Sequence, residues 1–274
     1  MPEQENTPLF RHVFYIHFVK IFHHFSDLLR LGAIVPEVEL MVDGDAWDHG
    51  PDGWQAQAEE IKGCGIPLSV HPPAWDVNAA APIGALREAA MWMNRKSAEL
   101  CHAVGGTQVV FHPGYYDSDS NFSRSRARDH CFRALEDLVS VCRPLGLTVA
   151  FENIAGPSMA LFTQEEYIHA LDGADPCVRF LLDLGHAHFN HWDIPSVIGQ
   201  IAPRLCGFHI HDNDGTGDAH LPIGRGTIAW ESVFEQMRRL PDEVLYVLEY
   251  AANTPLSALA EGRDILLREV EEKR

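Results

Sequence analysis

Residues 208–226, FHIHDNDGTGDAHLPIGRG, hold a dense set of side chains that can bind a metal ion. The apolar run before them predicts a buried strand, and residues two apart on a strand share a face, so His209 and His211 point the same way. Asp218 and His220 repeat this spacing. Imidazoles and carboxylates that converge at a strand end suit a divalent transition metal. The plainer interpretation is a polar loop in which Asp, Asn and Gly make turns. Two such pairs so close together favour the metal site.

The positions of the other polar residues depend on the fold. Short apolar runs alternate with longer amphipathic runs along the chain, which gives eight strand–helix pairs. Eight pairs in 274 residues favour a single (β/α)8 TIM-barrel domain over residues 1–274, because such a barrel typically takes about 250 residues. A doubly wound sheet is the weaker alternative, since no glycine-rich dinucleotide motif follows the first strand.

The active site of a TIM barrel lies at the C-terminal ends of its strands. The expected strands cover residues 12–19, 35–42, 66–71, 107–114, 147–152, 178–183, 205–210 and 243–249. The expected helices are a stretch ending at residue 31 and residues 53–65, 81–105, 122–143, 164–172, 194–203, 229–240 and 256–272. The metal-competent side chains at the strand ends are His71, His112, Glu152, Asp183 with His186, His209, Asp218 with His220, and Glu249. Each alone has a structural explanation, but a whole set on one rim indicates an active site.

The charge of the chain bears on its partners. The net charge is −18, with 21 Lys and Arg residues against 39 Asp and Glu residues. A protein that neutralises nucleic-acid phosphates normally carries a basic surface, whereas the loops expected at the strand ends are acidic or neutral. The one basic run, SRSRAR at residues 123–128, suits a solvated helix face at least as well as a phosphate contact. We therefore expect a small-molecule partner and no nucleic acid.

The sequence also predicts a cytoplasmic protein. Its six cysteines are scattered without a C-x-x-C pair, which is typical of free thiols in a reducing compartment. The first residues lack the basic start and apolar core of a signal peptide. No apolar run approaches the length of about 18 residues that a membrane span requires, so no membrane partner is expected.

Several short motifs resemble those of a known superfamily. The runs VHPP, FHPG, FEN, LDLGHAH, HIHDN, DAHLPIGRG and LEY occur in this order over nearly the whole chain. They resemble the xylose-isomerase-like barrel superfamily, which contains sugar isomerases and epimerases and also endonuclease IV of DNA repair. The resemblance is specific for the fold and the metal, and much less so for the substrate.

For the epimerase-type members, the resemblance implies one divalent metal (zinc, manganese, cobalt or magnesium) and no organic cofactor. The ligands would be Glu152, Asp183, His209 and Glu249. The family chemistry is proton transfer beside a ketose carbonyl through an enediolate, with the metal as a Lewis acid. Glu152 and Glu249 would exchange the proton, and His186 would hold a substrate oxygen.

This interpretation makes the protein an isomerase or epimerase of a sugar, a sugar phosphate or a keto acid. The candidate substrate-binding side chains are His71, His112, His211 and Arg225. Because dimers and tetramers are usual among the relatives, the resemblance implies a homo-oligomer.

Two other functions stay open. Endonuclease IV-like members use three zinc ions and nine ligands, which would add His71, His112, His186, Asp218 and His220 to the four above. This ligand count favours a multi-zinc phosphoesterase of AP endonuclease family 2. The acidic loops and the shared D-x-H-L-P-x-G motif of many sugar-isomerase-like barrels favour the isomerase. A non-catalytic metal-binding barrel is the third alternative, and the intact carboxylate pair argues against it.

Overall fold

The computed structural model describes residues 12–17, 38–42, 54–63, 65, 67–117, 122–251 and 254–273. Eight strands in this part of the chain form a closed barrel in sequence order, and every pair of neighbours is parallel, including the closing pair of β1 and β8. The strands are β1 His12–His17, β2 Val38–Met41, β3 Leu68–His71, β4 Gln108–Phe111, β5 Thr148–Glu152, β6 Val178–Asp183, β7 Leu205–Ile210 and β8 Leu245–Leu248. The predicted (β/α)8 barrel is thereby confirmed.

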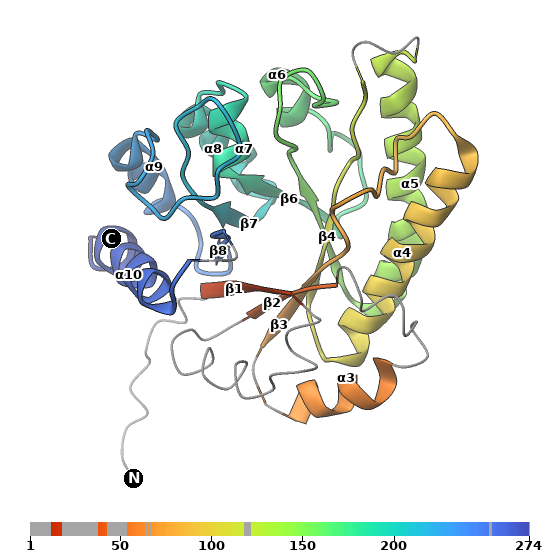
Figure 1. Cartoon of the computed structure of the whole chain (residues 1–274), viewed down its shortest axis with the longest axis horizontal. Coiled ribbons are helices and arrows are strands. Elements are labelled where there is room, and N and C mark those ends of the chain that lie inside the picture. Colours follow the sequence, from red (N-terminus) through yellow and green to blue (C-terminus); the bar gives the residue numbers. More distant parts are fainter. Residues whose placement is uncertain are drawn as a thin grey trace.

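Helices surround the strands (Figure 1). Those that correspond to predicted helices are α3 Trp54–Gly63, α4 Gly84–Ala103, α5 Arg124–Leu145, α6 Gln164–Ile168, α8 Ile194–Ile201, α9 Trp230–Met237 and α10 Leu256–Leu266. Three short segments were not predicted as separate elements: α7 Leu184–Phe189, a 3-10 turn at Ala202–Arg204 and a π-type turn at Leu267–Glu271. The expected helix that ends at residue 31 lies outside the described residues.

Local signals explain where several helices begin and end. The Ser123 hydroxyl accepts the Arg126 N–H at the start of α5, and Gly146 ends that helix with a left-handed φ of 70°. A capping box of Thr163 and Glu166 starts α6. These caps fix the termini of the helices that connect the strands.

Nearly all side chains of β2 to β8 are buried, on both faces of the sheet, as is usual for a parallel sheet covered by helices. Phe111 and Phe151 belong to the large apolar core that includes helix residues, whereas Val110, Ala150 and Leu181 form a separate small cluster with Cys206. Since side chains alternate along a strand, the small cluster fills the barrel interior. The next residues on this inner face are the polar ones, His112, Glu152 and Asp183. The alternation therefore directs the candidate ligands into the C-terminal mouth of the barrel.

Two further predictions can be compared with the described residues. Cys101, Cys131, Cys142, Cys177 and Cys206 are free, as expected, and Cys64 lies outside the described part. Among the described helices, none combines the length and the apolar character that crossing a bilayer requires.

Candidate active site and metal centre

Four of the predicted ligands meet at the C-terminal mouth of the barrel, and we call them the central group: Glu152, Asp183, His209 and Glu249. The register of β6 and β7 places Asp183 beside His209. His209 Nδ1 lies 2.9 Å from Glu152 Oε1, 2.9 Å from Glu249 Oε2 and 3.9 Å from Asp183 Oδ2. All four side chains are buried, and one ligand atom of each lies within 4.8 Å of the others.

The central group is strongly charged. Burial alone would raise the pKa of Glu152, but His209 and His112 hold it well below its usual value. Glu249 behaves in the same way, because His209 outweighs the effect of burial and lowers its pKa. Burial would lower the pKa of His209, yet the carboxylates around it, Glu249 first, raise its pKa well above the usual value. Glu152 and Glu249 are therefore ionised on either side of the imidazole that they share.

Buried atoms without hydrogen bonds indicate what the central group accommodates. Within the described part of the chain, Glu152 Oε2, Glu249 Oε2 and His112 Nε2 are buried and have no hydrogen bond of normal geometry, although each has a charged neighbour. Buried polar atoms are nearly always paired. Ionised carboxylates with free lone pairs, arranged around an imidazole nitrogen, have the chemistry of a divalent-cation site. The residues present thus fit the predicted metal.

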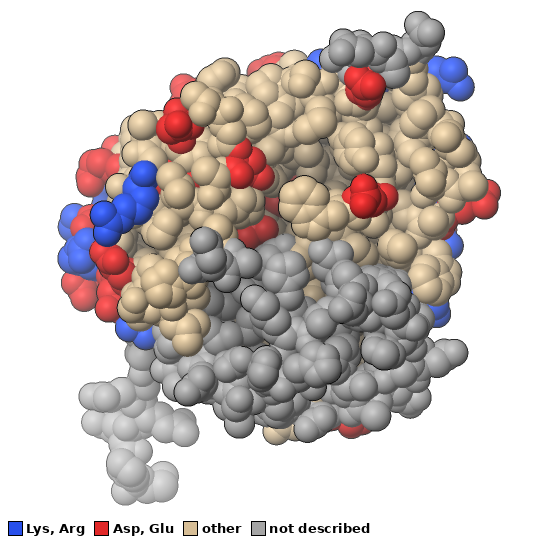
Figure 2. Space-filling view, in the orientation of Figure 1, with Lys and Arg blue, Asp and Glu red and all other residues tan. Residues whose placement is uncertain are grey.

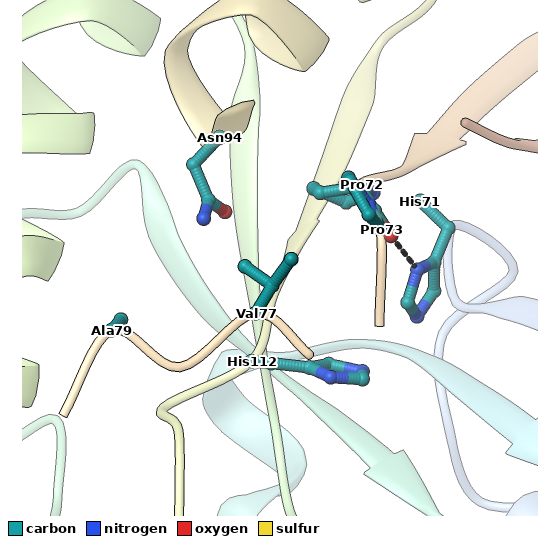
Figure 3. Close-up of a pocket in the computed structure, with 7 residues that line it drawn as sticks. All are labelled: His71, Pro72, Pro73, Val77, Ala79, Asn94 and His112. Carbon is teal, nitrogen blue, oxygen red and sulfur yellow. Dashed lines mark hydrogen bonds between the residues drawn. The ribbon is translucent and has the colours of Figure 1, made fainter. Parts of the chain in front are cut away.

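His71, at the end of β3, and His112, just after β4, both point towards the central group. His71 Nδ1 lies 2.6 Å from the Pro72 carbonyl oxygen (Figure 3). A carbonyl only accepts, so Nδ1 carries the proton and Nε2 is left facing Glu152 Oε2 at 3.6 Å. His112 Nε2 lies 2.7 Å from the same oxygen. The two rings, 4.7 Å apart and perpendicular, therefore converge on one carboxylate oxygen.

Little open space lies behind His71 and His112 in the described part of the chain. A cavity of about 10 Å³ is lined by both histidines and by Pro73, Val77 and Asn94, the last of which points inward from α4 (Figure 3). That volume suits about one water molecule. A ligand larger than water would therefore have to contact His71 and His112 from the mouth of the barrel.

A second cluster, the outer group, comprises His186, His211, Asp218 and His220. His186 lies on α7, which begins because Asp183 Oδ1 accepts the His186 N–H at 2.7 Å. The Nδ1 atoms of His186 and His220 donate to the carbonyl oxygens of Asn153 and Glu249, at 2.8 and 2.9 Å. Their Nε2 atoms are thereby left 3.3 and 3.2 Å from Asp218 Oδ2.

Two residues of the outer group, Asp218 and His220, are more exposed than the central group, and the backbone of His220 is strained. The side chains of Asp218 and His220 are 30% and 26% exposed. His220 has a φ of 46°, in the left-handed region that residues with a Cβ rarely adopt. Paired backbone hydrogen bonds between Asp212 and Leu221, and one from Ala251 to the His220 carbonyl, hold it there. Strain of this kind is typical of functional sites.

His211 occupies a different place from the one predicted. It is completely buried, its Nε2 donates to Asp183 at 3.1 Å, and its ring stacks on His220 with centroids 3.9 Å apart. A Cβ on Gly185 would lie 1.9 Å from its Cε1 atom, so only glycine leaves room for the ring. The predicted contact with substrate does not fit this burial. His211 instead supports a ligand of the central group.

Arg225 was predicted to contact the substrate. It is exposed on the loop after β7, and within the described residues its side chain has no hydrogen bond or ion pair. Of the basic run at 123–128, Arg124 and Arg128 both pair with Glu166 on α6, which is the structural interpretation of that run.

Two supporting residues were missed in the sequence. Asn153 exchanges hydrogen bonds with the backbone of Asp183, from Nδ2 to the carbonyl at 3.0 Å and from the N–H to Oδ1 at 2.8 Å. Glu39 on β2 is completely buried, and its Oε1 lies 2.9 Å from His209 Nε2. The signal for Glu39 was a single charged residue inside the apolar strand VELM.

The family follows from comparison with known proteins. Residues 32–269 match the xylose isomerase-like TIM barrel family. The chain belongs to that family. It is 29% identical to a probable endonuclease 4 of Aquifex aeolicus, over 73% of this chain and 75% of that protein. It is 23% identical to the L-ribulose-5-phosphate 3-epimerase UlaE of Escherichia coli K12, over 66% of this chain and 63% of that protein.

A solved structure shares the fold of this family member. A crystal structure described as a D-tagatose 3-epimerase-like protein superposes with a TM-score of 0.81 at 20% sequence identity. The match covers 94% of this chain and 97% of the other. It shows that the barrel is shared over nearly its full length.

Proposed function

We propose that the protein is a divalent-metal-dependent isomerase or epimerase of a sugar or sugar phosphate. The observation that carries the proposal is the central group, where three carboxylates and one imidazole converge with buried lone pairs that lack hydrogen bonds. Membership of the xylose isomerase-like family and the similarity to an L-ribulose-5-phosphate 3-epimerase support the choice of substrate class.

The cation would be held by Glu152, Asp183, His209 Nδ1 and Glu249. When bound, it supplies a Lewis acid beside the substrate carbonyl, which makes the neighbouring C–H more acidic. A set of one nitrogen and several oxygen ligands suits manganese, cobalt, magnesium or zinc.

The chain's own residues supply the proton chemistry. Glu152 and Glu249 stand on β5 and just after β8, strands that β6 and β7 separate in the barrel. Both are held ionised in this structure, so either can accept the proton from carbon. Inversion would then require the other carboxylate to have taken up a proton from solvent, which it delivers to the opposite face of the same carbon. Burial would lower the pKa of His186, but Asp183 and Asp218 raise it well above its usual value, so the ring is protonated on both nitrogens and its Nε2, beside Asp218, can donate to a substrate oxygen. This division of roles accounts for a change of configuration at one carbon.

Solvent isotope exchange tests the proposal directly. Protein reloaded with Mn²⁺, Co²⁺, Mg²⁺ or Zn²⁺ is incubated in D2O with ketoses and ketose phosphates, and deuterium at the carbon next to the carbonyl is followed by NMR. We expect isomerisation with deuterium incorporation for at least one substrate, and none after chelation. Absence of exchange with every sugar and metal would overturn the proposal.

A multi-zinc phosphoesterase is the second candidate, because His71 and His112 converge on Glu152 while His186 and His220 converge on Asp218. Its partner would be a phosphodiester. On the face shown in Figure 2, however, the described Lys and Arg side chains lie along the edges and acidic ones lie nearer the centre. A nuclease needs the opposite distribution. Cleavage of an abasic-site duplex at low salt by the zinc-loaded protein would favour this candidate over the isomerase.

A further inference from the structure

A buried carboxylate stands behind the central group, on the side of His209 that faces away from the other ligands. Glu39 lies on β2 and is 0% exposed. Its Oε1 lies 2.9 Å from His209 Nε2, and its Oε2 accepts the Ser69 hydroxyl at 2.9 Å. The register of β2 and β3 pairs Glu39 with Ser69 directly. One carboxylate oxygen is therefore held by the neighbouring strand β3 and the other by His209 on β7.

This position is expensive for a carboxylate. Removal of an ionised group from water costs several kcal/mol, and an apolar side chain inside a barrel avoids that cost. The cost is offset only while the hydrogen bonds to His209 and Ser69 persist. Glu39 thus contributes little to the packing of the barrel interior, and its main effect is on the His209 imidazole.

The partner of His209 differs from those of the neighbouring histidines. His71, His186 and His220 each donate from Nδ1 to a backbone carbonyl, and their Nε2 atoms face the carboxylates of Glu152 or Asp218. His209 is reversed, because Nε2 faces Glu39 and Nδ1 faces the central carboxylates. An ionised acceptor binds an N–H more strongly than a neutral carbonyl does. Such a partner fixes the tautomer and makes the other ring nitrogen a stronger metal ligand.

We propose that Glu39 is a positioning residue for the metal centre, which accepts the Nε2–H of His209 and so presents the Nδ1 lone pair to the cation. Ser69 holds the carboxylate in place for this purpose. The inference rests on the proposed metal-dependent function. It adds a residue that supports the metal centre without being one of the metal ligands.

Metal affinity measures this role without any substrate. Dissociation constants for Co²⁺ are determined by competition with a chromophoric chelator for the wild type, Glu39→Gln, Glu39→Ala and Ser69→Ala. Loss of such a partner typically weakens binding by about 10- to 100-fold. For Glu39→Ala we expect a loss of Co²⁺ affinity near the upper end of this range. Glu39→Gln keeps the hydrogen-bond geometry but loses the charge, so we expect the lower end and a shifted Co²⁺ visible absorption spectrum. We expect a smaller loss for Ser69→Ala.

Glu166→Gln is the matched control, since it removes a carboxylate that pairs with Arg124 and Arg128 on the outer helices. Its Co²⁺ affinity should equal that of the wild type. If Glu39→Gln and the control bind Co²⁺ equally well, the role of Glu39 is overturned while the metal centre stands. If the wild type itself binds no Co²⁺, the proposed function fails and the inference fails with it. Should Glu39→Ala not fold, the isosteric Gln variant decides.

Discussion

The central and outer groups use the same residue types but different supports. Glu152, Asp183 and His209 stand at the ends of strands, are completely buried and are fixed by the barrel register. Asp218 and His220 come from the loop after β7, remain partly exposed and include a left-handed backbone position. Groups on strands are placed more exactly than groups on loops. The central group is therefore suited to a tightly held ion and the outer group to an exchangeable ion or a substrate oxygen.

The hydrogen-bond acceptors of the imidazoles also differ between the central group and the outer group. The carboxylate of Glu39 supports the central histidine, whereas backbone carbonyls support His186 and His220. A stronger acceptor makes a stronger ligand, so the difference predicts that the two sites differ in metal affinity. His211 connects the groups, because it donates to Asp183 and stacks on His220.

The largest expected effect comes from Glu249→Gln in the central group. The amide cannot exchange a proton, and general acid–base catalysis typically contributes a factor of about 10²–10⁴. We expect kcat to fall by that factor while circular dichroism and the unfolding midpoint change little. Retention of wild-type deuterium exchange by this variant would remove Glu249 from the reaction.

Gly185→Ala tests the connection between the groups. The added Cβ would lie 1.9 Å from the His211 ring, and overpacking of this kind costs about 1–3 kcal/mol. We expect the free energy of unfolding in urea to fall by that amount. Gly199→Ala is the control, because the nearest atom to its Cβ is 3.9 Å away and the residue lies within α8. It should be neutral or stabilise the protein by up to about 1 kcal/mol. Equal stabilities of the two variants would contradict the tight packing of His211.

His220→Asn tests the independence of the outer group. Asparagine tolerates the left-handed backbone, so the loop should keep its shape while an imidazole is lost. In a zinc titration followed by calorimetry, we expect the weaker binding step to disappear and the tighter one to stay within about 10-fold of the wild type. Weakening of the tight step instead would show that the two groups form one site.

The smallest effect is a pH dependence of the metal-free protein. Burial lowers the pKa of His220, but Asp218 and Glu249 raise it to about 9. Because an unfolded histidine titrates near about 6.5, the charged interaction stabilises the fold fully below that pH and is lost as the pH rises through about 9. The unfolding free energy of chelated wild type should therefore fall between these values more than that of His220→Asn. Identical slopes for the two proteins would contradict the raised pKa.

Much of this arrangement could be predicted from the sequence, because the period of apolar residues fixes the strands and a barrel places strand ends on one rim. Glu152, Asp183 and His209 were found in that way. Glu39 could not be assigned, since its partner lies 170 residues away and the pairing depends on which side chains cross the barrel. The role of His211 depends on how deeply its side chain is buried, which the pattern of strand ends in the sequence does not indicate.

The short helix α7 escaped prediction for a related reason. Asp183 serves both as a strand-end ligand and as the cap whose Oδ1 accepts the His186 N–H, so the strand passes into a helix without a turn signal. Arg225 follows from its motif alone, and its side chain is exposed on the loop after β7. Motif position thus predicts the strand end and the loop, but not the direction of a loop side chain.

Equilibrium dialysis against Mn²⁺ with elemental analysis tests the central claim most directly, when wild type is compared with Asp183→Asn and His220→Asn. The account predicts one tightly bound Mn²⁺ per chain in wild type, kept in His220→Asn and lost in Asp183→Asn. A wild type without tight Mn²⁺, or an Asp183→Asn variant that keeps it, would contradict the assignment of the metal to the central group.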